Sequence, residues 1–293
     1  MSLSIPNYRI LEKLGTGASS TLFHISSLQG YKHYTVKYIK VHTPEDMKFL
    51  DQLKDEHTTG TSVDHPIVRR VFELRYVRRR LRIQAALLFM EYVEGMAMNS
   101  SDYAYPMVDT LEFFARAAEG IGAIHEAGFV HADLKPGNLL ITPQHRVKVI
   151  DLGQSCPINT AKSRVQGTIH YMAPEQAACK VVDARTDVFG LGATLYRVVT
   201  GATIATEMNR SLGVHAPGLL GMRMDELETA HEVDLPQSVE RLIAECCAKD
   251  PADRPKDMAE FAEHARMARA ILLTRGNAAA NQATFASDPT TPT

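Results

Sequence analysis

Near the N-terminus, a short glycine-containing segment has residues that suit phosphate binding. In GTGASSTL, residues 15–22, Gly15 and Gly17 allow the backbone to close over phosphate groups. The segment lies between two predicted strands, whereas a dinucleotide-binding fingerprint leads from a strand into a helix. An ordinary hairpin turn explains the same glycines equally well, because the third position of a GxGxxG loop is Ser20 here. The loop is a candidate phosphate site that needs support from elsewhere in the chain.

A lysine in the strand pattern YTVKYIK, residues 34–40, supplies part of that support. Lys37 alternates with apolar neighbours, and a lysine on an inward face needs an anionic partner. A surface lysine on an edge strand is the alternative. Glu56, on the helical pattern that follows, is a suitable partner. A lysine and a glutamate on facing elements pair and direct the ammonium group toward nucleotide phosphates, so the pattern favours a nucleotide site.

The most informative group of polar residues lies in HADLKPGNLLI, residues 131–141, followed by VKVIDLGQS, residues 147–155. Aspartate, lysine, proline, glycine and asparagine are all common in solvated turns. Together, however, the two segments resemble the catalytic loop HRDLKPxN and the metal-binding Asp-Phe-Gly motif of the protein kinase family. The lysine two residues after Asp133 is typical of serine/threonine kinases rather than tyrosine kinases.

The resemblance implies a separate role for each polar residue. Asp133 would accept the proton of the substrate hydroxyl, and Lys135 would neutralise charge on the transferring phosphoryl group. Asn138 and Asp151 would hold magnesium ions. Catalysis of this kind depends mainly on positioning and electrostatics, so the group of residues matters more than any single member.

Small-molecule phosphotransferases of the aminoglycoside-kinase type have a similar loop, HGDLHPGN, and the downstream sequence distinguishes the two families. Residues 166–176, QGTIHYMAPEQ, resemble the peptide-positioning loop and Ala-Pro-Glu motif of protein kinases. In that family Glu175 would pair with Arg254, and Asp187 would brace the catalytic-loop backbone. Thr168 would contact the catalytic aspartate and lysine, which is associated with serine/threonine specificity.

The segment FMEYVEG resembles the kinase hinge, with Met90 at the gatekeeper position. Backbone groups of Glu91 and Val93 would bond the adenine edge, and the ring would lie among Leu22, Thr35 and Leu140. Each of these side chains is also explained as ordinary core. In full, the predicted ATP-binding residues are Leu14, Gly15, Thr16, Gly17, Ala18, Ser19, Ser20, Leu22, Thr35, Lys37, Glu56, Met90, Glu91, Val93 and Leu140.

Ala132 departs from the family pattern, because it replaces the arginine that normally pairs with a phosphorylated activation loop. Without that cation a phosphate loses its main partner. We therefore expect activity that does not require activation-loop phosphorylation. Leu152 in place of phenylalanine and Ser20 in place of glycine are sterically tolerable. The candidate phosphate acceptors in the loop are Thr160, Ser163 and Thr168.

Gly60 is a second departure, four residues after Glu56, where the family usually packs a bulky apolar side chain against Leu152. The segment EHTTGTS also has poor helix propensity, with glycine about 1 kcal/mol less favourable than alanine. We expect the end of this helix to be loose and the pair of Lys37 with Glu56 to be only partly populated. An activating partner or a homodimer contact would then complete the pair.

The elements that position these residues change character along the chain. Short runs rich in β-branched and aromatic residues predict five strands within residues 8–93, interrupted by one helix over residues 44–59. Helical patterns dominate after that. We predict an α+β, two-lobed protein-kinase fold with an N-lobe at 8–93 and a mainly helical C-lobe at 94–270. Residues 271–293 contain few large apolar side chains and predict a disordered tail or linker.

Composition limits the other functions. The net charge of -2 gives no global attraction to nucleic acid or anionic membranes. Seven arginines between residues 69 and 82 favour a solvated basic hairpin, with a docking site for an acidic or nucleic-acid partner as the alternative. The four cysteines form no CxxC pair, and the N-terminus lacks a secretion signal, so we expect a cytoplasmic protein.

The predicted function is transfer of the γ-phosphate of ATP to serine or threonine hydroxyls of proteins. The implied cofactors are ATP and Mg²⁺, with Mn²⁺ as an alternative ion. A pseudokinase that holds nucleotide and acts as a scaffold is a second interpretation, although such proteins usually lose the equivalents of Lys37, Asp133 or Asp151. A small-molecule phosphotransferase is the third.

Overall fold

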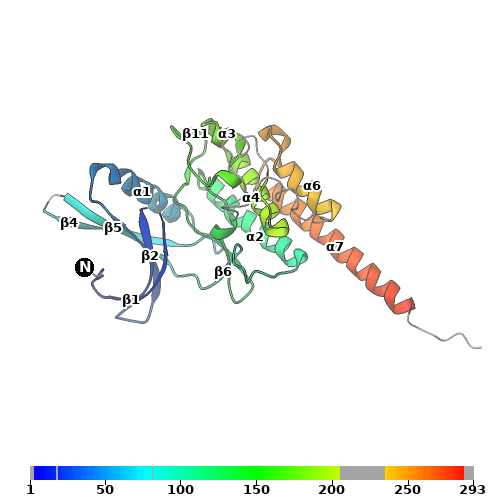
Figure 1. Cartoon of the computed structure of the whole chain (residues 1–293), viewed down its shortest axis with the longest axis horizontal. Coiled ribbons are helices and arrows are strands. Elements are labelled where there is room, and N and C mark those ends of the chain that lie inside the picture. Colours follow the sequence, from blue (N-terminus) through cyan, green and yellow to red (C-terminus); the bar gives the residue numbers. More distant parts are fainter. Residues whose placement is uncertain (1–2, 18, 81, 205–234, 287–293) are drawn as a thin grey trace, which may run out of the picture.

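The computed structural model describes residues 3–17, 19–80, 82–204 and 235–286. It has two lobes, one formed by a sheet with a single α-helix and the other mainly by helices (Figure 1). The predicted two-lobed α+β architecture is therefore confirmed. In the described part of the chain, no helix is both long enough and apolar enough to cross a membrane.

The N-lobe sheet is antiparallel, with strand order β1-β2-β3-β5-β4. Successive side chains of a strand point to opposite faces, so β3 directs Val36 and Lys37 to different sides. Ile39, on the same face as Lys37, packs with apolar residues of helix α1. Helix α1 therefore covers the face from which Lys37 extends. The strands are β1 (Tyr8–Thr16), β2 (Ser20–Ser27), β3 (His33–Lys40), β4 (Val71–Arg79) and β5 (Arg82–Glu91).

Helix α1 (Met47–Ser62) follows one 3-10 turn, η1 (Pro44–Asp46). Leu53 and Glu56 are buried on one face of the helix, as expected for residues three apart. The predicted helix over residues 44–59 is thus present, but its α-helical part begins and ends three residues later.

Gly60 packs against strand β4 rather than beside Leu152. A Cβ atom added to Gly60 would lie 2.2 Å from Cγ2 of Val71, because strand β4 approaches the helix closely at this point. The side chain of Val71 thus fills the space that the missing side chain leaves. Leu152 packs against Val63, Val68 and Ile124 instead.

Helix α4 (Ala184–Thr200) has strong signals at both ends and carries Asp187 into the C-lobe. Asp183 and Thr186 form a reciprocal capping box at its start. Gly201 ends it with φ +74, a left-handed conformation that glycine adopts readily. The other helices are α2 (Met107–Glu126), α3 (Pro174–Ala177), α6 (Gln237–Cys246) and α7 (Met258–Ala286), with 3-10 turns η2 (Pro136–Asn138), η3 (Ile169–Tyr171) and η5 (Pro251–Asp253).

Short strand pairs hold the loops of the C-lobe. Strands β6, β8 and β9 form one sheet, β7 pairs with β10, and β11 pairs with β12. The last two pairs fix both ends of the segment that follows Asp151. The strands are β6 (Met96–Ala97), β7 (Phe129–Val130), β8 (Leu139–Ile141), β9 (Val147–Val149), β10 (Cys156–Pro157), β11 (Thr160–Ala161) and β12 (Val181–Val182).

Residues 271–286 of the predicted disordered tail or linker are helical. Helix α7 continues through them to Ala286 and extends away from the C-lobe in Figure 1. This stretch includes five alanines between residues 278 and 286, and alanine has the highest intrinsic helix propensity. The remaining residues of the predicted tail, 287–293, lie outside the described part of the chain.

The two lobes are joined through the segment between α1 and β4 as well as through the hinge. The amide of Val149 donates to the carbonyl of Ile67 at 2.8 Å, and the amide of Arg69 donates to the carbonyl of Val149 at 2.9 Å. Lys148 contacts both carboxylate oxygens of Glu91 at 2.8 Å. Strand β9, which leads to Asp151, is therefore fixed directly to the N-lobe.

Candidate active site

Asp187 holds the start of the catalytic loop. It is 1% exposed, and a buried carboxylate requires hydrogen-bond partners. It accepts bonds from the amides of His131 and Ala132 at 2.7 and 2.8 Å and from Nε2 of His125 at 2.8 Å. Burial opposes ionisation of Asp187, but the histidines and the backbone donor lower its pKa below the ordinary value. The carboxylate thereby fixes two consecutive backbone groups of the loop.

Asp133, the predicted proton acceptor, lies at the centre of a compact group. Its Oδ1 accepts bonds from both the amide and the hydroxyl of Thr168 at 2.8 Å, and its Oδ2 lies 2.6 Å from Nζ of Lys135. Lys135 also donates to the Thr168 hydroxyl at 3.0 Å. The structure therefore brings together three residues that are up to 35 positions apart in sequence.

A second charged group lies across the cleft between the lobes. Nζ of Lys37 is 2.7 Å from Glu56 and 3.0 Å from Asp151. Burial disfavours the ammonium ion, but the two carboxylates outweigh burial and raise the pKa of Lys37. Burial would raise the pKa of Asp151, yet Lys37 and the nearby Lys135 and Arg69 lower it. The structure shows the Lys37–Glu56 pair formed, and its expected partial population stays a prediction.

Asn138 and Asp151 are chemically suited to magnesium, which prefers oxygen ligands and is often held by few protein groups together with substrate phosphates. The amide nitrogen of Asn138 donates to the carbonyl of Asp133 at 2.8 Å, which leaves its amide oxygen as an acceptor. Asp151 supplies a carboxylate from a left-handed backbone conformation, φ +64. Among the described residues no cluster of three or more histidine, cysteine or acidic side chains could hold a metal. The donor set therefore fits an ion shared with a nucleotide.

A cleft of about 540 Å³ connects the two charged groups, which is a typical size for a ligand site. It is lined by the glycine-rich turn, strand β3, helix α1, the catalytic loop and two parts of the activation segment, residues 151–154 and 164–168. The predicted residues among its lining are Ser19, Ser20, Lys37, Glu56, Asp133, Lys135, Asp151 and Thr168. These residues belong to the phosphate end of the predicted nucleotide site.

The other predicted ATP-binding residues are not among those that line this cleft. Thr35 and Met90 are buried, Glu91 is bound by Lys148, and Val93 follows β5 in the hinge. Leu22, Leu140 and Gly15 are partly buried, whereas Leu14, Thr16 and Gly17 are exposed. The predicted residue Ala18 lies outside the described part of the chain.

The remaining predicted residues lie in the activation segment or hold it in place. Arg254 is 4% exposed and binds Glu175 through two nitrogens, at 2.8 and 2.9 Å. Of the candidate phosphate acceptors, Ser163 is exposed, while Thr160 is half-buried in β11. The hydroxyl of Thr168, the third candidate, is already bonded to the catalytic group.

Two residues of this region were missed by the sequence analysis. Arg69, grouped there with the basic hairpin, is buried behind the hinge, and its Nη1 contacts the sulfur of Met90 at 3.8 Å. Burial lowers the pKa of Arg69. Gln176 is buried beside the catalytic loop and donates to two backbone carbonyls. Neither Arg69 nor Gln176 lies in a periodic run of apolar residues, so the sequence gives no sign that these polar side chains are buried.

Comparisons with known proteins agree with this geometry. The family model for the protein kinase domain matches residues 8–266. The serine/threonine-protein kinase PknA of Mycobacterium tuberculosis is 28% identical over 270 residues, which cover 90% of this chain and 61% of the relative. PknB of Mycobacterium leprae is 29% identical over 202 residues (66% of this chain, 32% of the relative). A tyrosine-protein kinase, MasK of Myxococcus xanthus, is 29% identical over 280 residues (87% and 42%).

The chain thus spans about three fifths or less of the length of these relatives. The family model, in contrast, is matched over nearly all of the two lobes. Kinases of this family use ATP and a divalent metal ion, commonly magnesium. On the strength of this match and of the paired charged groups in the cleft, the chain belongs to the protein kinase family.

Proposed function

We propose that this chain is a serine/threonine protein kinase domain, which transfers the γ-phosphoryl group of Mg-ATP to serine or threonine hydroxyls of proteins. The observation that carries the proposal is the joint contact of Thr168 with Asp133 and Lys135. This contact joins the peptide-positioning loop to the group that would receive the substrate hydroxyl. The names of PknA and PknB agree with the proposal, whereas that of MasK makes the acceptor residue the point to test.

In the proposed reaction Asp133 orients the hydroxyl and accepts its proton. Both of its oxygens are engaged, but a carboxylate has about four acceptor positions, so it retains room for the substrate. Lys135 faces the transferring group. Lys37, held by Glu56, positions the nucleotide phosphates, and Asn138 with Asp151 would hold magnesium, which neutralises charge on the phosphate oxygens when bound.

We also propose that this activity needs no activation-loop phosphate. Ala132 provides no side-chain cation for a phosphate, yet the loop is ordered against the catalytic group through Thr168 and against β12 through Thr160. Electrostatic preorganisation of this kind is the main source of rate enhancement in phosphoryl transfer. A loop that is already in place gains little from an added charge.

The test uses phosphatase-treated chain, labelled ATP, magnesium and a protein substrate, followed by identification of the modified residues. We expect phosphoserine and phosphothreonine, with turnover within about tenfold of the untreated protein. Asp133→Asn should reduce transfer by at least about a thousandfold, since it removes the acceptor of the substrate proton. Label on tyrosine alone, or transfer that survives Asp133→Asn, would refute the assignment. A protein that binds nucleotide without transfer would be a pseudokinase.

A further inference from the structure

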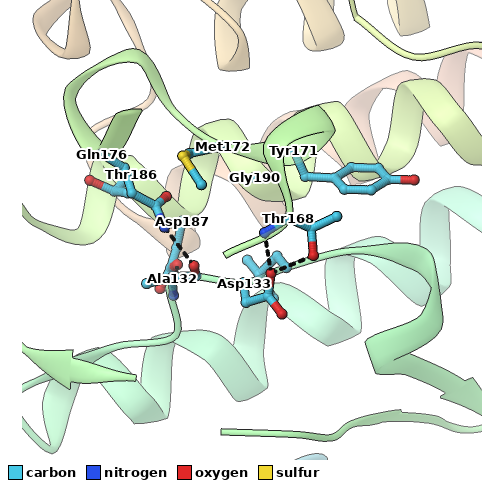
Figure 2. A pocket seen from close by; sticks show the side chains of 10 residues that line it. Ala132, Asp133, Thr168, Tyr171, Met172, Gln176, Thr186, Asp187 and Gly190 are labelled. Carbon is cyan, nitrogen blue, oxygen red and sulfur yellow. Dashed lines mark hydrogen bonds between the residues drawn. The ribbon is translucent and has the colours of Figure 1, made fainter. Parts of the chain in front are cut away.

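Gln176 occupies an internal position between the two loops of the active site. It follows the Ala-Pro-Glu motif in α3 and is 6% exposed. Its Nε2 donates to the carbonyl of Ala132 at 2.7 Å and to the carbonyl of Gln166 at 2.9 Å. A primary amide has two N–H groups, so this nitrogen uses both. Figure 2 shows Gln176 beside Ala132, Thr186 and Asp187, on one side of the small pocket that also contains Asp133 and Thr168.

The two carbonyls belong to segments that meet at the proposed proton acceptor. Ala132 immediately precedes Asp133, and Gln166 lies two residues before Thr168. Thr168 donates two bonds to Asp133. A single amide therefore fixes the catalytic loop and the activation segment just before the point at which they contact each other.

Both segments have a residue with positive φ next to this amide. Ala132 has φ +59, which is uncommon for a residue other than glycine and is disfavoured unless the surroundings enforce it. Gly167 has φ +118, and an added Cβ would lie 3.0 Å from Nε2 of Gln176 and 3.1 Å from the carbonyl oxygen of Ala132. The adjoining cavity has only about 10 Å³, room for at most about one water molecule.

We infer that Gln176 is a positioning residue for phosphoryl transfer. Its amide ties the activation segment to the catalytic loop, a task that the family usually gives to a pair of arginine and phosphate. The inference rests on the proposed function, and it explains how a chain with Ala132 holds Thr168 against Asp133 without modification. This positioning role requires two N–H donors on one buried nitrogen, whereas a role in packing requires only a side chain of similar size.

The first experiment compares Gln176→Leu and Gln176→Glu with the unmodified chain after phosphatase treatment. Each change leaves buried carbonyls without a donor, so kcat should fall roughly 10- to 100-fold at about pH 7.5. KM for ATP should stay within about twofold, because the nucleotide residues are untouched. The exposed Gln144 offers a matched control, and Gln144→Leu should leave kcat unchanged. Nucleotide-induced thermal shifts equal to those of the unmodified chain would establish that the variants fold.

The second experiment separates donation from packing through the pH profile. A protonated carboxyl at position 176 again donates one hydrogen bond, so Gln176→Glu should recover part of its kcat, relative to the unmodified chain, as the pH falls toward about 5.5. Gln176→Leu should not recover. Gly167→Ala should reproduce the loss in kcat by separating the same groups.

The outcomes distinguish this inference from the proposed function. If the unmodified chain transfers no phosphate to protein, the proposed function fails. If the unmodified chain is active and Gln176→Leu keeps kcat within about twofold, only the inference about Gln176 is overturned. An equal loss in both variants with no pH-dependent recovery would also contradict it, because packing alone would then account for the effect.

Discussion

Asp187 illustrates how one buried carboxylate can organise a catalytic loop. It receives two backbone amides and one imidazole, and all three are donors that a neutral amide cannot fully match. Asp187→Asn would direct an N–H group toward at least one of these donors. We expect a loss of about 2–4 kcal/mol in the free energy of unfolding at pH 7, measured by urea denaturation. Asp64→Asn, at an exposed surface pair with Arg70, should change it by less than about 1 kcal/mol.

The same residue gives a prediction for pH. The pKa of Asp187 is lower in the folded protein than in the unfolded chain, where it is about 3.9. The carboxylate therefore stabilises the fold fully above about pH 5, and this contribution is lost as the pH falls through the unfolded pKa toward the lower folded one. The difference in unfolding free energy between the unmodified chain and Asp187→Asn should shrink between about pH 5 and pH 3. A difference that stays constant over this range would show that the ionised form is not what stabilises the loop.

At the scale of single elements, the contact between α1 and β4 depends on the absence of a side chain at Gly60. A methyl group there would lie 2.2 Å from Val71 Cγ2 and 2.7 Å from its Cβ. Gly60→Ala should lower the free energy of unfolding by about 1–2 kcal/mol, since overpacking outweighs the gain in helix propensity. In a Val71→Ala background the same change should cost less, because the clash with Cγ2 is removed while the 2.7 Å approach to Cβ remains.

This reduction in cost can be checked by a double-mutant cycle with urea denaturation. Gly122, in α2, is the matched control, because a Cβ added there meets its nearest neighbour at 3.7 Å. Gly122→Ala should stabilise the protein slightly in either background. If Gly60→Ala has the same effect with and without Val71, the contact does not determine the position of α1.

The elements show where sequence reasoning succeeded and where it reached its limit. Short runs of β-branched and aromatic residues predicted the five strands, and helical spacing of apolar residues predicted the helix before β4. The catalytic motifs located the charged groups of the cleft. The end of α1 was misjudged because local propensity disfavours Gly60, whereas packing against Val71 requires it. Gln176 was not identified because its partners are backbone carbonyls, 10 and 44 residues away, which leave no trace in residue type.

On the scale of the whole molecule, the proposed active site is assembled from both lobes. Lys37 and Glu56 come from the N-lobe, whereas Asp151 comes from the C-lobe beyond strand β9. The backbone hydrogen bonds of Val149 and the ion pair of Lys148 with Glu91 hold the two lobes together at strand β9. A ligand that contacts both sides of the cleft should therefore stabilise the molecule as a unit.

A non-hydrolysable ATP analogue with magnesium provides the measurement. At about 100 times its Kd it should stabilise the fold by about 2.7 kcal/mol, which corresponds to a rise in Tm of roughly 5–10 °C for a chain of this size. Chelation of the metal should reduce the rise, because nucleotide phosphates then lose the cation that links them to Asp151. Asp151→Asn should abolish this magnesium-dependent part, while the exposed Asp102→Asn should keep it. A magnesium-dependent rise in Tm that persists in Asp151→Asn would mean that other residues hold the metal, and the assignment of Asp151 as a metal ligand would be wrong.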